Sequence, residues 1–455
     1  MSTKRYILIT VFLLAGLQAT GAFSQEITTI EPVSVSTSVA KFWTIEDCLL
    51  HAMENNPSVR SAHNGLKAAS GSNLMAVSEF MPRLSWNTTY VQNDKTSLGS
   101  LAATIPGLSP SIYSKDFYTS SLSADLTLFS WRMKPLRSTM KSTSKLARLK
   151  LALAQNDLTL NVKKAFYTAL YAKQLLIIAQ SAEDVARENL ETSESLYKVG
   201  QVSSFDVSRA RVRRVNAKTG VISAKNYEIV SIEGLRMVLS LPAGEDLDIK
   251  GAFPQDARDA VLEDEIAVAL KRRPELNIAK EAETLQLSAR ELARAGFLPT
   301  IFAGFAYSWE GLDLTADMDK YYTSWVTKAG ISIPIFDGLF SIGNFSAQKA
   351  GLAQAREQVR GASDGVLMEV RQSYYSLANT RESLQAQQEN IETAAENLRI
   401  AQERYKMGFL SLLELKDAEL SLVEARTQQI KALYDYNISM ISLDRAVGLP
   451  SGEDK

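Results

Sequence analysis

The chain has 455 residues, and its 50 basic and 51 acidic side chains leave a net charge of -1. This balance, without a basic tail, argues against a nucleic-acid partner. A single cysteine, Cys48, excludes an intramolecular disulfide and is expected to be a buried small hydrophobe. The only histidines are His51 and His63, and there is no phosphate-loop, HExxH or GxSxG motif. We therefore predict a protein that is not an enzyme, with neither a cofactor nor a metal site.

The N-terminus is typical of a secretory signal peptide. Two basic residues precede an apolar run of twelve residues from Tyr6 to Leu17, and small residues follow. The run is shorter than the ~20 residues that a spanning helix needs, which disfavours a membrane anchor. Leu17 stands where a lipoprotein would have its acylated cysteine, so no lipid anchor is expected. We predict a signal peptide over 1–24 and an extended N-terminal arm over 25–41.

The rest of the chain contains one pattern twice. Residues 45–82 recur 217 residues later, and from Phe129 onward the two copies match at an offset of 207–208 residues. Matches that keep the same order over so long a stretch indicate a tandem duplication. The predicted segments are a first repeat over 42–242, a linker over 243–261, a second repeat over 262–450 and a tail over 451–455.

Each repeat is predicted to contain a helix, two strands and a long helical hairpin. In the first repeat the initial helix is expected over 44–80. Residues 136–197 contain neither glycine nor proline, and Ala or Leu recurs there at every seventh position. Sustained heptads predict long helices that pack as coiled coils. The hairpins are predicted to turn at Gly200 and Gly408.

Four segments alternate apolar and polar residues and are the predicted strands, two within 83–129 and two within 300–336. Such alternation is typical of membrane barrel strands, although a half-buried sheet of a soluble protein has the same pattern. Aromatic residues near the strand ends favour the membrane, because Trp and Tyr collect at the two faces of a bilayer. The predicted aromatic belt consists of Trp86, Tyr90, Trp309, Tyr321, Tyr322 and Trp325.

Four strands cannot close a barrel alone. In lipid the backbone groups of an open edge would have no partners, and the smallest single-chain barrels have about eight strands. We therefore predict an oligomer, and a trimer would supply twelve strands around a wider lumen. The predicted fold class is mainly α with a membrane β-barrel, in which the duplicated hairpins form a helical tube, or α-barrel, on the periplasmic side.

Several short motifs occur in the same order in both repeats. They are Ala52 with Pro57 and Ala269 with Pro274, the Phe-x-Pro strand entries at 80–82 and 297–299, and the YxxG turns at 197–200 and 405–408, each followed by an acidic residue and an alanine. The series resembles that of the TolC-like outer-membrane efflux proteins and covers about residues 42–450.

This resemblance implies a homotrimer in the outer membrane of a Gram-negative bacterium, with a twelve-stranded barrel joined to an α-helical tunnel across the periplasm. The implied function is that of a passive exit duct for tripartite efflux or type I secretion. The implied partners are outer-membrane lipid, a periplasmic adaptor, and an inner-membrane pump or ABC-type exporter. Two alternatives are a periplasmic adaptor, which has one hairpin flanked by β domains, and an extracellular coiled-coil protein, which has no use for aromatic-belted strands.

Two acidic residues follow the second turn. Glu414 and Asp417 are spaced i, i+3 and should share one helix face. By resemblance they match the acidic rings of the periplasmic gate, where the carboxylates of three copies would repel one another, have raised pKa values and attract cations. Alternatively, both are ordinary solvated acids near a helix N-terminus, where the helix dipole favours them.

By resemblance, Asp206 and Tyr405 help to hold the closed gate through hydrogen bonds between hairpins. The basic residue that would pair with the aspartate corresponds to Leu410 here, so a latch must use another residue such as Arg209 or Lys416. Packing at a helix end is the alternative role of Tyr405.

The hairpin tips are predicted to dock the adaptor, because apolar residues at exposed turns indicate a contact surface. A plain helix cap is the alternative role of the two glycines. The tip residues are Val199, Gly200, Val202, Met407, Gly408 and Phe409.

Overall fold

The computed structural model of the protein describes residues 42–92, 116–242, 244, 247–254, 259–311 and 322–449. The segments predicted as signal peptide, N-terminal arm and C-terminal tail lie outside this part of the chain, as does Tyr321. The helices and strands of the described residues are β1 (Phe42–Trp43), α2 (Ile45–Asn55), α3 (Pro57–Ser78), β2 (Arg83–Gln92), β3 (Asp116–Ser130), α5 (Met133–Lys198), α6 (Ser204–Leu239), β4 (Asp248–Ile249), α7 (Leu262–Arg272), α8 (Pro274–Ala295), β5 (Thr300–Gly311), β6 (Tyr322–Ser332), α9 (Phe340–Lys406) and α10 (Leu412–Val447).

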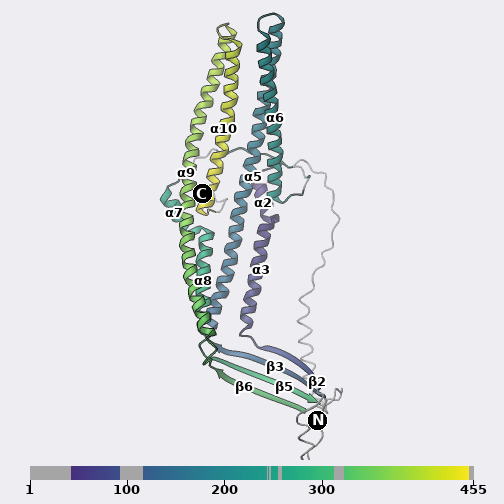
Figure 1. Cartoon of the computed structure of the whole chain (residues 1–455), viewed down its shortest axis with the longest axis vertical. Coiled ribbons are helices and arrows are strands. Elements are labelled where there is room, and N and C mark those ends of the chain that lie inside the picture. Colours follow the sequence, from purple (N-terminus) through teal and green to yellow (C-terminus); the bar gives the residue numbers. More distant parts are fainter. Residues whose placement is uncertain are drawn as a thin grey trace, which may run out of the picture. The chain divides into compact units, whose positions relative to one another are not determined.

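The two long hairpins lie side by side (Figure 1). In the first hairpin α5 packs along α6, in the second α9 packs along α10, and α5 and α10 contact each other between them. α6 and α9 are therefore the outer helices of the row. The helices α5 and α9, 66 and 67 residues long, continue past the hairpins toward the sheet, accompanied by α3 and α8. The predicted pair of duplicated long hairpins is confirmed.

The initial helix of each repeat is broken, contrary to the single helix predicted over 44–80. Asn56 has an extended backbone and separates α2 from α3, and its side chain accepts a hydrogen bond from the first turn of α3. Pro57 occupies the first position of α3, where a missing N–H costs nothing. Arg273 and Pro274 form the same break between α7 and α8.

The four longer strands form one antiparallel sheet in the order β2-β3-β5-β6, which confirms the predicted four strands per chain. The sheet departs in two places from the alternation predicted within 83–129 and 300–336. The register shifts between Thr127 and Phe129, so that Leu128 interrupts the alternation as a bulge. Ile333 and Ile335 lie beyond β6, because Pro334 between them has no N–H to donate to the ladder.

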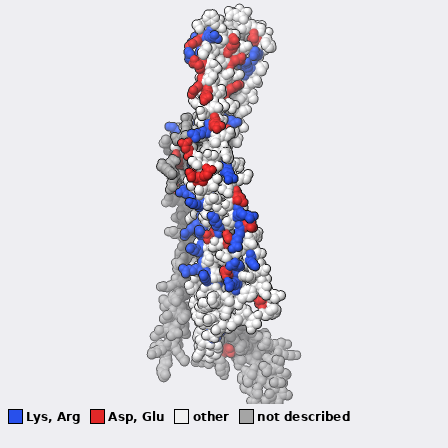
Figure 2. Space-filling view, turned by 90° about the vertical axis from the view of Figure 1, so that its left-hand side faces the viewer, with Lys and Arg blue, Asp and Glu red and all other residues white. Residues whose placement is uncertain are grey.

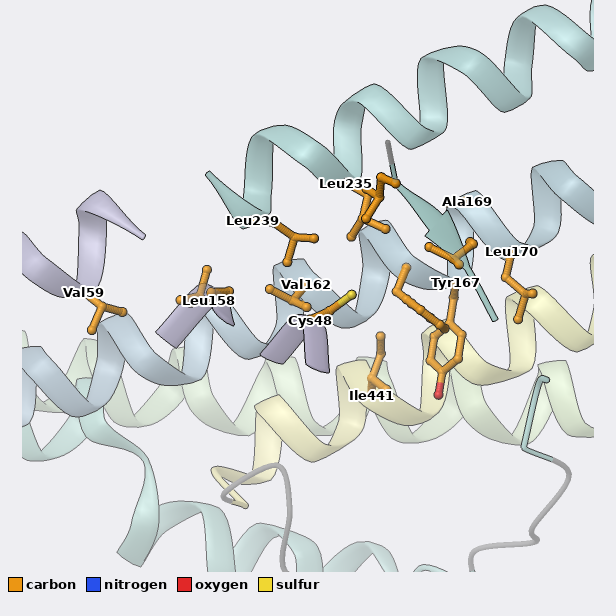
Figure 3. Packing of buried hydrophobic residues seen from close by; sticks show 14 residues of the cluster. Cys48, Val59, Leu158, Val162, Tyr167, Ala169, Leu170, Leu235, Leu239 and Ile441 are labelled. Carbon is orange, nitrogen blue, oxygen red and sulfur yellow. The ribbon is translucent and has the colours of Figure 1, made fainter. Parts of the chain in front are cut away.

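The largest buried cluster joins α2 to α5, α6 and α10 (Figure 3). Cys48 of α2 packs there with Phe166 of α5, with Leu235 and Leu239 of α6, and with Ile441 of α10. The pairing of β1 with β4 lies beside this cluster and ties the linker to the start of the first repeat. The short helix α2 therefore fixes the lower end of the first hairpin.

We expect Cys48 to resist maleimide in the folded protein and to react fully after denaturation. The side chain is completely buried. Burial, together with the charges of Asp47 and Glu46, raises the pKa of the thiol to about 12, so the reactive thiolate is scarce at neutral pH. Intact mass spectrometry measures the labelled fraction, and a Cys48→Ala variant controls for labelling elsewhere. Rapid labelling of the folded protein would contradict this assignment.

An ionic cluster ties the break between α7 and α8 to the end of α10. Arg273 is 3% exposed, and its Nη1 donates to the carbonyl oxygens of Arg445 and Ala446 at 3.0 and 3.1 Å. Its Nη2 donates to Glu369 of α9 at 2.5 Å. The acidic partners of the Arg445 guanidinium are Glu369, Glu275 and Asp157. The guanidinium of Arg273 thus donates to the Ala446 carbonyl in the last turn of α10 and adds a second donor to the Arg445 carbonyl, which also accepts from the Gly448 N–H.

The first repeat has a simpler form of the same tie. Asn56 occupies the position that corresponds to Arg273, and its side-chain amide donates to the carbonyl oxygen of Val238 near the end of α6 at 2.9 Å. The two repeats therefore share a link from the helix break to the end of the returning helix. A neutral amide makes this link in the first repeat, and a charged guanidinium makes it in the second.

Charged residues are unevenly spread on the face shown in Figure 2. Lys, Arg, Asp and Glu are interspersed along the helical part of this face and around the hairpin tip, and they become sparse toward the sheet. No helix in the described ranges has both the length and the apolar composition needed to span a bilayer.

Candidate functional site

Glycine ends the first helix of each hairpin. Gly200 and Gly408 have φ angles of +74° and +80°, in the left-handed region that favours glycine. The Gly200 N–H donates to the Tyr197 carbonyl at 2.9 Å, and the Gly408 N–H donates to the Tyr405 carbonyl at 3.0 Å. Both glycines therefore act as helix caps, whatever else the tips bind.

Apolar side chains surround these turns and are open to solvent. Val199 is 68% exposed, Met407 62% and Phe409 79%, while Val202 is half-buried. Isolated exposed apolar residues are common, but here they gather at the ends of two neighbouring hairpins. The tips therefore present exposed apolar side chains among charged residues at one end of the helical row.

The carboxylate of Glu414 caps its own helix. Ser411 is the N-cap of α10, and its hydroxyl and backbone N–H donate to Glu414 Oε2 at 2.7 and 2.9 Å, while the Glu414 N–H donates back to Ser411 Oγ at 3.2 Å. The hydrogen bonds from Ser411 lower the pKa of Glu414 within one chain. Repulsion from neighbouring copies in a ring would have to overcome this lowering before the pKa could rise.

Asp206 has the same role in the first hairpin. Its carboxylate accepts hydrogen bonds from the hydroxyl and N–H of Ser203, the N-cap of α6, at 2.7 and 3.0 Å, and these bonds lower its pKa. Asp206 thus corresponds to Glu414 and is bonded within its own hairpin. The expected hydrogen bond from Asp206 to the other hairpin is not among the contacts of the described residues.

Asp417 makes an ion pair between the two hairpins close to their tips. Its Oδ1 lies 3.2 Å from Nη2 of Arg213 on α6, and both side chains are partly exposed. The sequence had suggested Arg209 or Lys416 for such a link. Lys416 instead pairs with Glu419 one turn further along α10, at 2.8 Å. Arg213 was missed because no local pattern reports which residues of two separate hairpins face each other.

Tyr405 lies at the end of α9 and is 37% exposed. Within the described ranges its hydroxyl has no hydrogen-bond partner, and its backbone carbonyl accepts the bond that caps the turn. Leu410, which replaces the expected basic residue, is half-buried beside the turn. Within one chain the structure therefore brings Arg213 and Asp417 together. The contacts of Asp206 and Tyr405 among the described residues are local, and their part in holding a closed gate stays a prediction.

The sheet has one apolar and one polar face. On the apolar face Trp86 lies opposite Leu122, Leu122 opposite Tyr307, and Tyr307 opposite Trp325, so that one residue from each strand forms a row. Trp309 follows on the same face, with its ring centroid 4.7 Å from that of Tyr307. Tyr307 was not in the predicted belt, although the alternation in its strand places it on this face.

The next row along the sheet faces the other way and is polar throughout. It consists of Asn87, Ser121, Ser308 and Ser324. A strand set with one apolar, aromatic face and one polar face is the arrangement of a membrane barrel that surrounds water. Of the remaining belt residues, Tyr90 lies in β2 on the apolar face, and Tyr322 is the first residue of β6.

No group of three or more potential metal ligands occurs among the residues that the structure describes. The predicted site residues that the structure describes lie at or near the hairpin tips and in the sheet. These features define a class of proteins with duplicated helical hairpins. In this class a sheet faces a membrane at one end of the helices, and charged turns lie at the other end.

A family model described as outer membrane efflux protein matches residues 49–238 and 266–449, which is most of the chain. The chain therefore belongs to the outer membrane efflux protein family. The resemblance drawn from the duplicated motifs is confirmed, and with it the predicted outer-membrane location.

The outer membrane protein TolC of Escherichia coli is 24% identical over 326 residues, which cover 66% of this chain and 63% of that protein. The alkaline protease secretion protein AprF of Pseudomonas aeruginosa is 22% identical over 397 residues, covering 85% of this chain and 80% of AprF. The structure of the Campylobacter jejuni CmeC outer membrane channel matches with a TM-score of 0.76 at 18% identity, covering 90% of this chain and 87% of that one. The match with TolC thus spans less than two thirds of the length of that protein. The three similarities together favour a channel over a periplasmic adaptor.

Proposed function

We propose that three copies of this chain form a passive exit duct across the outer membrane and the periplasm. The observation that carries this proposal is the sheet, which has an apolar aromatic face and is open at β2 and β6. In lipid each unpaired backbone group costs several kcal/mol, so both edges must pair with neighbouring copies. Three copies supply twelve strands, which leave a wider lumen than the eight-stranded barrels that side chains fill.

The outer helices support the same closure. α6 and α9 carry exposed apolar side chains, several of them seven residues apart, as helices that pack on another copy do. On α6 they include Val212, Val215, Ile222, Ile229 and Met237, and on α9 they include Met368, Tyr375 and Ile400. If α6 of one copy packs on α9 of the next, the row of four long helices per chain continues into a closed tube.

The acids of the second hairpin tip form the gate in this proposal. Threefold symmetry brings the copies of Glu414 and Asp417 to one aperture, where negative charge attracts cations and hinders anions. The pair between Arg213 and Asp417 holds the two hairpins of one chain together at this level. Opening the aperture by separating the hairpins would break this pair, so Arg213 takes the latch role that Leu410 cannot fill.

The exposed apolar tips are the proposed docking surface for a periplasmic adaptor, which would connect the duct to an inner-membrane pump or ABC-type exporter. Similarity to both TolC and a protease secretion protein supports a role in either efflux or type I secretion. In such an assembly the energised partner selects the cargo, and the duct contributes a passage.

The mass of the detergent-solubilised protein and its conductance in planar bilayers test this proposal together. We expect a mass of three chains and a steady ionic conductance. A monodisperse single chain in buffer without detergent, or a trimer that does not conduct, would contradict it.

Two lysine substitutions on one strand provide a matched control. Ala303 and Ala306 are both half-buried in β5 but lie on the apolar and polar faces respectively. Ala303→Lys puts a charge toward lipid near the helical end of β5 and should reduce the amount of inserted trimer. The cost of such a charge falls from about 2–4 kcal/mol per chain at the bilayer centre to about 0–1 kcal/mol near an interface. Ala306→Lys faces the lumen and should insert normally. Equal insertion of both variants would show that the sheet does not have a lipid face.

A further inference from the structure

A row of charged residues crosses the polar face of the sheet. Arg83, the first residue of β2, lies opposite Asp125 of β3, Asp125 lies opposite Gly304 of β5, and Gly304 lies opposite Lys328 of β6. Three of the four positions in this row therefore carry a charge, whereas the polar row that contains Asn87 is uncharged. Only residues 79–82 separate Arg83 from the end of α3, so the row begins near the end of the sheet where the helices join it.

Lys328 reaches across a whole strand to contact Asp125. Its Nζ lies 2.9 Å from Asp125 Oδ1, although β5 runs between β3 and β6. Gly304 makes this contact possible, because a Cβ at that position would lie 2.4 Å from Lys328 Cε and 2.7 Å from Asp125 Oδ1. Both charged side chains remain more than half exposed, so the pair is open to solutes on this face.

The row has a net positive charge. Asp125 balances Lys328, and Arg83 has no ion-pair partner among the described residues, which leaves one excess positive charge per chain. The polar face is the one that would surround water, because the opposite face carries the apolar and aromatic rows. In the proposed trimer the excess charges of three copies would be distributed around one level of the lumen.

We propose that Arg83, Asp125 and Lys328 form a cationic ring in the lumen, at the junction of helical tube and barrel, that favours the passage of anionic solutes. This inference rests on the proposed function, since it requires a closed and conducting barrel. Asp125 limits the positive charge of the ring by neutralising Lys328, and Gly304 leaves the space in which the two side chains make contact. The ring favours anions, whereas the acidic tips favour cations. The duct therefore has regions of opposite charge at two levels.

The ratio of chloride to potassium permeability, measured from reversal potentials in a KCl gradient near 0.1 M, tests the ring. Lys328→Gln and Arg83→Gln should each lower the ratio about twofold, and Asp125→Asn should raise it about twofold, since three charges at ~10 Å act through water and are partly screened. The acids of the tips are unchanged in all variants, so differences from the parent protein report on the sheet.

Two further variants separate charge from damage to the barrel. The double variant Asp125→Asn with Lys328→Gln keeps the net charge and should return the ratio to that of the parent protein. Gly304→Ala separates the pair but also keeps the net charge, and should leave the ratio unchanged. Conducting channels in which Lys328→Gln and Asp125→Asn shift the ratio in the same direction, or not at all, would overturn the ring and leave the duct intact. Loss of conductance in the parent protein would instead overturn the proposed function.

Discussion

Replacing Arg273 with alanine is expected to lower the free energy of unfolding by about 3–5 kcal/mol, the usual cost of removing one partner from a buried ion pair. The guanidinium is almost fully buried and makes bonds to both Glu369 and the carbonyls at the end of α10. Its loss would leave Glu369 with a single cationic partner, Arg445, and would leave the carbonyls of Arg445 and Ala446 without this donor. The apparent melting temperature of the solubilised protein, followed by circular dichroism, measures the effect.

The duplication offers the matched control. Asn56→Ala removes the corresponding tie in the first repeat, but there the loss is a neutral hydrogen bond and a helix cap, each worth about 1 kcal/mol. The Arg273 variant should therefore melt well below the Asn56 variant. Equal melting temperatures would show that the ionic cluster adds nothing beyond the neutral tie.

The same cluster predicts a dependence on pH. Burial disfavours ionised Glu369, but the hydrogen bond and charge of Arg273, together with Arg445, hold its pKa below the ordinary 4.5. The stability from this carboxylate is thus complete above the unfolded pKa and is lost as the pH falls through the lowered folded value. The parent protein should lose more stability between pH 5 and pH 3 than Arg273→Ala, and an equal loss would contradict the assignment.

Neutralising both acids of the proposed gate, with Glu414→Gln and Asp417→Asn, is expected to abolish block of the channel by divalent or trivalent cations added to the periplasmic side. Glutamine is chosen because it preserves the capping box with Ser411 while it removes the charge. A ring of carboxylates concentrates multivalent cations, and uncharged amides do not. Single-channel recording over a range of cation concentrations gives the blocking constant, and unchanged block would contradict the gate assignment.

Arg213→Gln distinguishes the gate from the latch. It removes the partner of Asp417 and leaves both acids charged, so cation block should persist or strengthen. The hairpins of one chain would lose the ion pair near their tips, and the channel should spend more time in its most open conductance level. If Arg213→Gln abolished cation block without changing the conductance levels, Arg213 would belong to the gate and would not be the latch.

Several features of this protein follow from its sequence alone, because they depend on local or periodic signals. The heptads of α5 and α9 specify long helices whatever surrounds them, and the glycines at positions 200 and 408 specify the turns because only glycine adopts that backbone at low cost. Alternation of apolar and polar residues predicted the four strands and their apolar face, apart from the bulge at Leu128 and the residues beyond Ser332. The ordered motifs of the two repeats were sufficient for the family, which the family model confirms.

Contacts between segments far apart in the chain were decided by the tertiary structure. Asp417 meets Arg213, 204 residues away, only because two hairpins pack in one register, and Lys328 meets Asp125 only because glycine leaves a gap in the strand between them. Likewise, the prediction of one helix over 44–80 missed the break at Pro57 although proline is a local signal for it, and the tie from Asn56 to α6 has no local signal. Periodicity reports the face of a helix or strand on which a side chain lies, and packing decides which other side chain it faces there.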